Sequence, residues 1–266
     1  MSKKSIGVFD SGLGGLTVLK ALRRTLPHEN LIYFGDSANV PYGSKSKQTV
    51  TRFSLDIARF LESQGVKMIV VACNTASALA LPELRKHCRV PVLGVIEPGA
   101  KQAAATSRNG KIAVLGTEGT VKSNAYAKAI LKYHPRARVI QQACPLFVPL
   151  VEENWASQPA TRLVAQTYLS SVRRHRADTV ILGCTHYPVL KKVISDVLGP
   201  QVKLVDASQA VAQAVQDFLR ENKQHQSTGK GKLTVYASDD PIRFKRLATY
   251  LLADKIGTVH LKKLNA

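Results

Sequence analysis

The chain has 266 residues, with 38 lysines and arginines against 18 aspartates and glutamates, a formal net charge of +20. Its 45% hydrophobic content is ordinary for a globular protein and excludes disordered and collagen-like chains. The longest apolar runs, at 68–73 and 90–96, are far shorter than the roughly 20 residues that span a bilayer. Lys3 and Lys4 are followed by Asp10 before an apolar segment long enough for a signal peptide can form. We therefore expect a cytoplasmic protein with no membrane contact.

Short β-branched runs alternate with helical patterns along the whole chain. Strands are predicted at 5–9, 30–34, 67–72, 91–94, 111–115, 138–141, 179–182, 202–205 and 233–237. Helices are predicted at 15–26, 48–64, 76–87, 124–133, 160–174, 189–197, 208–221 and 241–252. This alternation predicts an α/β fold with mainly parallel sheets, in which ligands bind at the carboxyl ends of the strands. A polar surface loop is expected at 221–232.

The sequence repeats itself weakly. Residues 6–12 resemble 112–118, and residues 68–75 resemble 179–186 at a nearly equal offset. Two such pairs in register predict two α/β halves of like topology, a pseudo-symmetric repeat. The cysteine in each member of the second pair is then expected at an equivalent position in its half.

The repeat suggests a division into two domains. Residues 1–97 together with 208–266 are assigned to the first domain, and residues 98–207 to the second. Glu97–Gly99 lies where one half passes into the other and is interpreted as a hinge. The active site is expected in the cleft between the domains.

The basic residues form small clusters, such as 173–176 and 191–192, and no long tract. We interpret them mainly as solvated helix faces, although the charge also predicts weak, non-specific binding to polyanions. An alternative class is a basic nucleic-acid-binding or gyrase-modulating protein, which only the charge suggests. A salt titration of DNA binding separates loose electrostatic attraction from a specific site.

Two loops after predicted strands carry candidate binding groups. Asp10–Gly15 leads from the first strand into a helix, but Thr17 replaces the third glycine of a dinucleotide fingerprint and no Walker lysine is present. Its backbone N–H groups suit an anion, and Asp10 suits either an ammonium group or a helix cap. Pro41–Gly43, after the second strand, has turn chemistry that leaves backbone N–H groups free.

Two cysteine motifs give the sharpest signal. Cys73-Asn74-Thr75 and Cys184-Thr185-His186 each follow a strand and precede a helix, whose N-terminus favours a thiolate. Because the chain has no C-x-x-C motif, a zinc ribbon and a thioredoxin centre are poorly supported. A symmetric thiol pair suits racemisation instead: one thiolate removes a proton from a carbon, and the opposing thiol returns one from the other face.

The motifs together resemble the cofactor-independent aspartate/glutamate racemase family, in its glutamate branch. The match runs almost end to end, through residues 9–15, 35–36, 41–43, 72–77, 145–152 and 182–188. The resemblance implies two facing α/β domains, no cofactor, no metal, and interconversion of L- and D-glutamate, with D-glutamate supplied to peptidoglycan synthesis. Aspartate is the rival substrate. A homodimer is an open expectation. The chain starts without the extension of relatives that a cell-wall nucleotide precursor activates, so such activation is not expected.

The resemblance also implies roles for individual residues. Cys73 would act on the D-enantiomer and Cys184 on the L-enantiomer, assisted by Asp10, Glu152 and His186. Substrate binding would fall to Asp10, Ser11, Tyr42, Gly43, Asn74, Thr75, Thr185 and His186. Residues 238–244 fit the family pattern only loosely, and the high basic charge is not explained by it.

Overall fold

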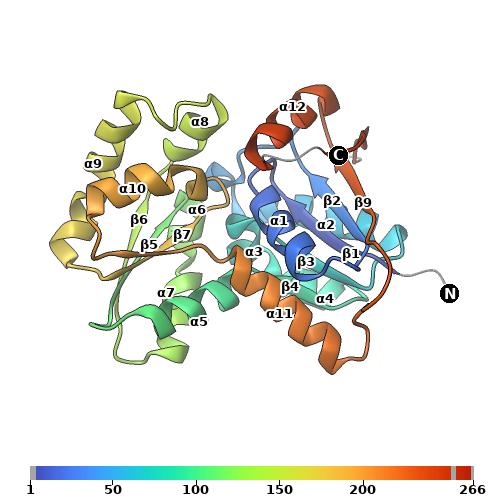
Figure 1. The fold of residues 1–266 in the computed structure, drawn as a ribbon, viewed down its shortest axis with the longest axis horizontal. Helices are drawn as coiled ribbons and strands as arrows, with labels where there is room; N and C mark the ends of the chain where they lie inside the picture. Colours follow the sequence, from blue (N-terminus) through green and yellow to red (C-terminus); the bar gives the residue numbers. More distant parts are fainter. Residues whose placement is uncertain (1–3, 253–255, 265–266) are drawn as a thin grey trace.

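The computed structural model describes residues 4–252 and 256–264, and shows two sheets side by side, each flanked by helices (Figure 1). The strands are β1 Ile6–Asp10, β2 Leu31–Gly35, β3 Met68–Val71, β4 Val92–Gly94, β5 Lys111–Gly116, β6 Arg138–Ala143, β7 Thr179–Gly183, β8 Lys203–Val205, β9 Leu233–Ala237 and β10 Val259–Leu261. Within the described residues, one sheet has the order β10-β9-β2-β1-β3-β4 and the other β6-β5-β7-β8. Every pairing is parallel, so the α/β prediction is confirmed.

The helices cover the sheets and connect the strands. They are α1 Leu16–Thr25, α2 Lys47–Ser63, α3 Asn74–Leu79, α4 Leu81–His87, α5 Ile96–Thr106, α6 Glu118–Ser123, α7 Ala125–Tyr133, α8 Phe147–Glu152, α9 Pro159–His175, α10 Lys191–Leu198, α11 Ser208–Glu221 and α12 Pro241–Leu252, with 3₁₀ turns η1 Tyr42–Ser44 and η2 Tyr187–Leu190. No helix in the described ranges is long and apolar enough to cross a membrane.

The predicted repeat is present in the strand order. In the first sheet the strands run β2-β1-β3-β4, and in the second β6-β5-β7-β8, so β1 corresponds to β5 and β3 to β7. Cys73 lies just beyond β3 and Cys184 directly beyond β7, at equivalent positions of the two halves. The first sheet is extended at the β2 edge by β9 and β10, which brings the last part of the chain back to the first half (Figure 1).

One hydrophobic core connects the two halves. Val8 of β1, Ile181 of β7 and Val211 of α11 belong to a single cluster of buried side chains. Helix α11 packs against both α1 and α5, and α5 packs in turn against β7. The halves are therefore joined on this side by continuous apolar packing, and the second side of each sheet has a core of its own.

Three local expectations need correction. The predicted helix 76–87 is two helices, α3 and α4, because Pro82 occupies the first turn of α4 and cannot continue the preceding helix. Glu97–Gly99 lies in the first turn of α5, a helix that was not predicted and in which a proline is tolerated at this position; its interpretation as a hinge stays a prediction. Helices α6 and α8 and strand β10 were not predicted either; all three are short.

Candidate active site

The two thiols are buried at the carboxyl ends of β3 and β7. Cys73 is the N-cap of α3, and its Sγ accepts a hydrogen bond from the backbone N–H of Ala76 at 3.4 Å. The same thiol donates to Ser11 Oγ at 3.7 Å. Cys184 lies between β7 and η2, and only 6% of its surface is exposed. Each thiol thus lies at the end of a strand and is buried below the molecular surface.

Both thiols line one small cavity between the halves. Its walls are formed by Ser11, Val40, Pro41, Tyr42, Gly43, Cys73, Asn74, Thr75, Thr117, Val148, Cys184, Thr185 and His186. All the residues predicted to bind substrate are among them except Asp10. The cavity measures about 20 Å³, which is room for about one water molecule. The site is therefore closed in this structure.

Asp10 lies behind the cavity and does not line it. Its fully buried carboxylate accepts hydrogen bonds from the backbone N–H of Gly12 at 2.9 Å and from Thr185 Oγ1 at 3.3 Å. Burial raises the pKa of Asp10, and the nearby charge of His186 opposes that shift. Asp10 therefore links the glycine-rich loop of the first half to the second cysteine motif.

The glycine-rich loop approaches the second motif too closely for a side chain. A Cβ at Gly14 would lie 2.2 Å from Thr185 Oγ1 and 2.8 Å from His186 Nδ1. The contact between the halves thus accounts for glycine at this position.

His186 bridges the second thiol and Glu152. Its Nδ1 lies 3.8 Å from Cys184 Sγ, and its Nε2 lies 3.2 Å from Oε1 of Glu152 on α8. Burial alone would lower the pKa of His186, but the hydrogen bonds to Cys184 and Glu152 outweigh it and raise this pKa to about 10. In the protonated ring both nitrogens donate, one to the sulfur and one to the carboxylate.

The two thiols differ in their electrostatic surroundings. Burial, reinforced by the negative charge of Asp10, raises the pKa of Cys73 to about 12, so this residue holds its proton near neutral pH. Cys184 instead lies beside the ring of His186, with its Sγ 3.8 Å from Nδ1. The negatively charged neighbour of one thiol is therefore replaced by a histidine at the other.

Sequence analysis did not predict the cluster of threonine hydroxyls, Thr75, Thr117 and Thr120, where the two halves are in contact. Thr117 Oγ1 lies 2.9 Å from Thr75 Oγ1 and 3.1 Å from Oγ1 of Thr120 on α6. The repeat could have identified Thr117, because it follows β5 as Ser11 follows β1. Tyr126, whose hydroxyl donates to Asn74 Oδ1 at 2.6 Å, carries no comparable sequence signal.

The charge on His186 makes stability depend on pH. Its pKa rises from 6.5 to about 10 on folding, so its contribution is present in full below pH 6.5 and is lost as pH rises through about 10. We expect the free energy of unfolding to fall between pH 7 and 9, and to fall less in His186→Gln. Urea unfolding at both pH values measures this. His87→Gln, at an exposed histidine of α4, should keep the wild-type fall. An equal fall in His186→Gln and wild type would contradict the assignment.

Two side chains that can act as acid and base line one closed cavity, and each comes from one of two like halves. Such an arrangement suits an enzyme that inverts a carbon centre by proton transfer. The model of the family described as Asp/Glu/Hydantoin racemase matches residues 6–215. The chain belongs to this family and is an amino-acid racemase, an isomerase. Among the described residues, no group of three His, Cys, Asp or Glu side chains is arranged to hold a metal ion.

Similar proteins cover the chain over its full length. A glutamate racemase of Geobacter metallireducens is 51% identical over 100% of this chain and 99% of its own. The crystal structure of a Bacillus anthracis glutamate racemase has a TM-score of 0.96 at 34% identity, covering 99% of each chain. That of Francisella tularensis glutamate racemase in complex with D-glutamate has a TM-score of 0.93 at 38% identity, covering 100% of this chain and 99% of the other.

Proposed function

We propose that this racemase interconverts L- and D-glutamate by proton transfer at the α-carbon, without a cofactor, and so supplies D-glutamate for peptidoglycan. The observation that carries the proposal is the pair of buried thiols at equivalent positions of two like halves, both lining one cavity. The relatives named glutamate racemase, one of them with D-glutamate bound, support glutamate as the substrate.

In the proposed reaction the thiols exchange roles with direction. For L-glutamate, the Cys184 thiolate removes the α-proton, and the Cys73 thiol delivers its own proton to the opposite face of the carbanion. The Cys73 proton is in place because burial raises the pKa of this thiol to about 12. For D-glutamate, Cys73 is the base and Cys184 the acid. His186 contacts both Cys184 and Glu152, and we propose that His186 and Glu152 assist Cys184 in proton transfer as Asp10 assists Cys73.

The cavity walls suit a dicarboxylate. Hydroxyl and amide groups come from both halves: Ser11, Asn74 and Thr75 from the first, and Thr185 from the second. Tyr42 and Gly43 add a wall of turn backbone between them. We propose that these groups bind the two carboxylates and the ammonium group of glutamate, with Thr117 as a further contact.

Glutamate does not fit a cavity of about 20 Å³. We therefore propose that the domains, 1–97 with 208–266 and 98–207, separate to admit the substrate and close over it, which removes water from the carbanion. All four cysteines are free, as expected in a reducing compartment, and we place the enzyme in the cytoplasm. Weak polyanion binding and a homodimer stay predictions.

Cofactor independence has a direct test. Enzyme dialysed against a chelator should racemise L- and D-glutamate at its full rate, because both proton-transfer groups belong to the chain. Circular dichroism follows the loss of optical activity, and aspartate in place of glutamate tests the rival substrate. Activity that dialysis removes and a metal or pyridoxal phosphate restores would contradict the mechanism, and a preference for aspartate would contradict the substrate.

A further inference from the structure

Residues 40–43, the end of the loop that starts at Asp36, form part of the first-half wall of the cavity, and the loop is anchored at its other end. Asp36 follows β2 directly and is 1% exposed. Its Oδ2 accepts a hydrogen bond from the hydroxyl of Tyr42 at 2.5 Å. The Tyr42 ring is equally buried and lines the catalytic cavity. The position of Tyr42 in the wall is thus tied to one buried carboxylate.

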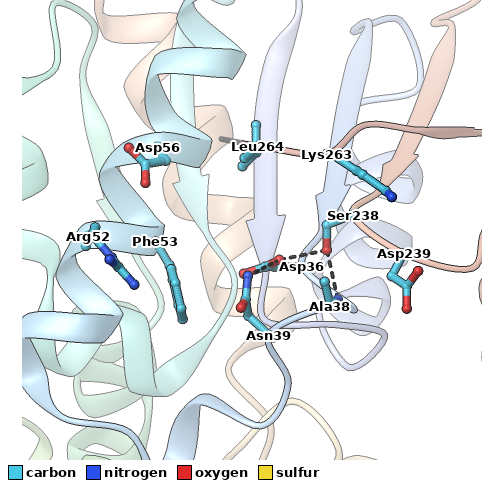
Figure 2. A pocket seen from close by; sticks show the side chains of 10 residues that line it. All are labelled: Asp36, Ala38, Asn39, Arg52, Phe53, Asp56, Ser238, Asp239, Lys263 and Leu264. Atoms are coloured by element: carbon cyan, nitrogen blue, oxygen red, sulfur yellow. Dashed lines mark hydrogen bonds between the residues drawn. The ribbon is translucent and has the colours of Figure 1, made fainter. Parts of the chain in front are cut away.

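That carboxylate is held in turn by a residue from the other end of the chain. Ser238 Oγ donates to Asp36 Oδ1 at 2.7 Å and accepts the backbone N–H of Ala38 at 2.9 Å (Figure 2). Gly35 pairs with Ala237 in the register of β2 and β9, and this pairing places Ser238 beside Asp36. Ser238, 5% exposed, therefore fastens the loop at two points.

On the side of Asp36 that faces away from the catalytic cavity, few side chains pack against the loop. A pocket of about 440 Å³ lies against Asp36, Asn39 and Ser238, between α2 and the end of the chain (Figure 2). Arg52 and Phe53 of α2 line its far wall. Because a pocket adjoins this side, the orientation of the Asp36 carboxylate depends on its hydrogen-bond donors: Ser238, Tyr42 and, at 3.1 Å, Asn39 Nδ2.

The inner side of the loop tolerates little displacement. A Cβ at Gly43 would lie 2.6 Å from the Cβ of Thr117, so the loop backbone is in close contact with the second half. Thr117 is also hydrogen-bonded to Thr75, beside Cys73. A shift of Tyr42 and Gly43 therefore changes the substrate-facing wall directly.

We propose that Ser238 is a positioning residue for racemisation: through Asp36 it fixes Tyr42 and Gly43 in the geometry that receives the substrate. The inference rests on the proposed function, in which Tyr42 and Gly43 contact glutamate. Burial, together with the charge of Asp36, raises the pKa of Tyr42, so its hydroxyl stays a donor to Asp36 throughout the working range.

Ser238→Ala removes the hydrogen bonds to Asp36 and from Ala38 and does not alter the two catalytic thiols. We expect KM for both enantiomers of glutamate to rise about tenfold, with kcat within about twofold, because binding is weakened without loss of an acid–base group. Ser238→Thr keeps the hydroxyl, and the pocket beside it has room for the added methyl, so this variant should keep the wild-type KM.

Ser37→Ala is the matched control. Ser37 also makes two hydrogen bonds at this corner, accepting from Asp239 N at 3.0 Å and donating to Asp239 O at 2.7 Å, but none to Asp36. Its loss should cost similar thermal stability and leave KM unchanged. A rise in KM that is equal in Ser37→Ala and Ser238→Ala would show a merely structural role and overturn the proposal.

A double-mutant cycle with Tyr42→Phe tests whether Ser238 acts on Tyr42 through Asp36. Tyr42→Phe removes the hydroxyl that Asp36 accepts, so adding Ser238→Ala should raise KM by less than twofold beyond Tyr42→Phe alone. Additive effects would overturn the path through Asp36. The unaltered enzyme is assayed beside each variant: if it fails to racemise glutamate, the proposed function is wrong, whereas an active enzyme with equal KM in wild type and Ser238→Ala contradicts only the positioning role.

Discussion

Cys73→Ala and Cys184→Ala should each lower kcat for glutamate racemisation by at least about 10²–10⁴-fold, the range that a single acid–base group contributes. Each variant keeps one base but has nothing opposite to complete the inversion. Initial rates in both directions, with thermal unfolding as a check on folding, measure the effect. Cys88→Ala, at a half-buried cysteine that does not line the cavity, is the matched control and should keep full activity.

The same variants should retain half of the chemistry. Elimination from a glutamate analogue with a leaving group on its β-carbon needs one base: the thiolate takes the α-proton, and the leaving group departs with the electron pair of its bond. Cys73→Ala should then eliminate from the L-analogue and Cys184→Ala from the D-analogue. Near-normal racemisation by either variant would make that cysteine a packing residue.

Gly14→Ala should lower kcat/KM about 100-fold. The new methyl group would lie 2.2 Å from Thr185 Oγ1 and 2.8 Å from His186 Nδ1, so the two loops must move apart. Displacements of about 1 Å at a catalytic site cost about that much in rate. Steady-state kinetics measure the loss.

Gly257→Ala is the control for the previous variant, because a Cβ there meets no atom within 4 Å. It should leave kcat/KM unchanged. If Gly14→Ala stayed within a few-fold of wild type, the contact between the glycine-rich loop and the second cysteine motif would not matter for catalysis.

The regular elements could be predicted where local pattern decides structure. The buried strands read as continuous apolar runs, and β1, β3, β5 and β7 carry the repeat that predicted two like halves. Helix α5 was missed because Glu97-Pro98-Gly99 has the composition of a break. The proline is tolerated in the first turn, and Gly99 packs where a Cβ would lie 2.9 Å from that of Ala207.

Strand β10 was missed for a different reason. It has three residues, two of them exposed, and it lies at the edge of the sheet, so no apolar run marks it. Tertiary pairing with β9, and not local pattern, makes it a strand.

The residues of the site likewise divide into those that local sequence pattern predicts and those that only tertiary contacts bring together. Both cysteine motifs are contiguous in sequence, and each could be recognised from its own strand end. The network of Asp36 and Ser238 could not, because the two residues are 202 positions apart and meet only through the pairing of β2 with β9. The bond of Asp10 to Thr185 likewise exists only once the halves are in contact.

The most direct test of the two-thiol account is racemisation of L-glutamate in deuterium oxide, followed by proton NMR at low conversion. If Cys184 removes the α-proton and Cys73 delivers another from the opposite face, D-glutamate carries one deuterium at the α-carbon from the first turnovers, while the remaining L-glutamate keeps its proton. D-glutamate that retains the original α-proton would mean that one base serves both faces, and would contradict the account.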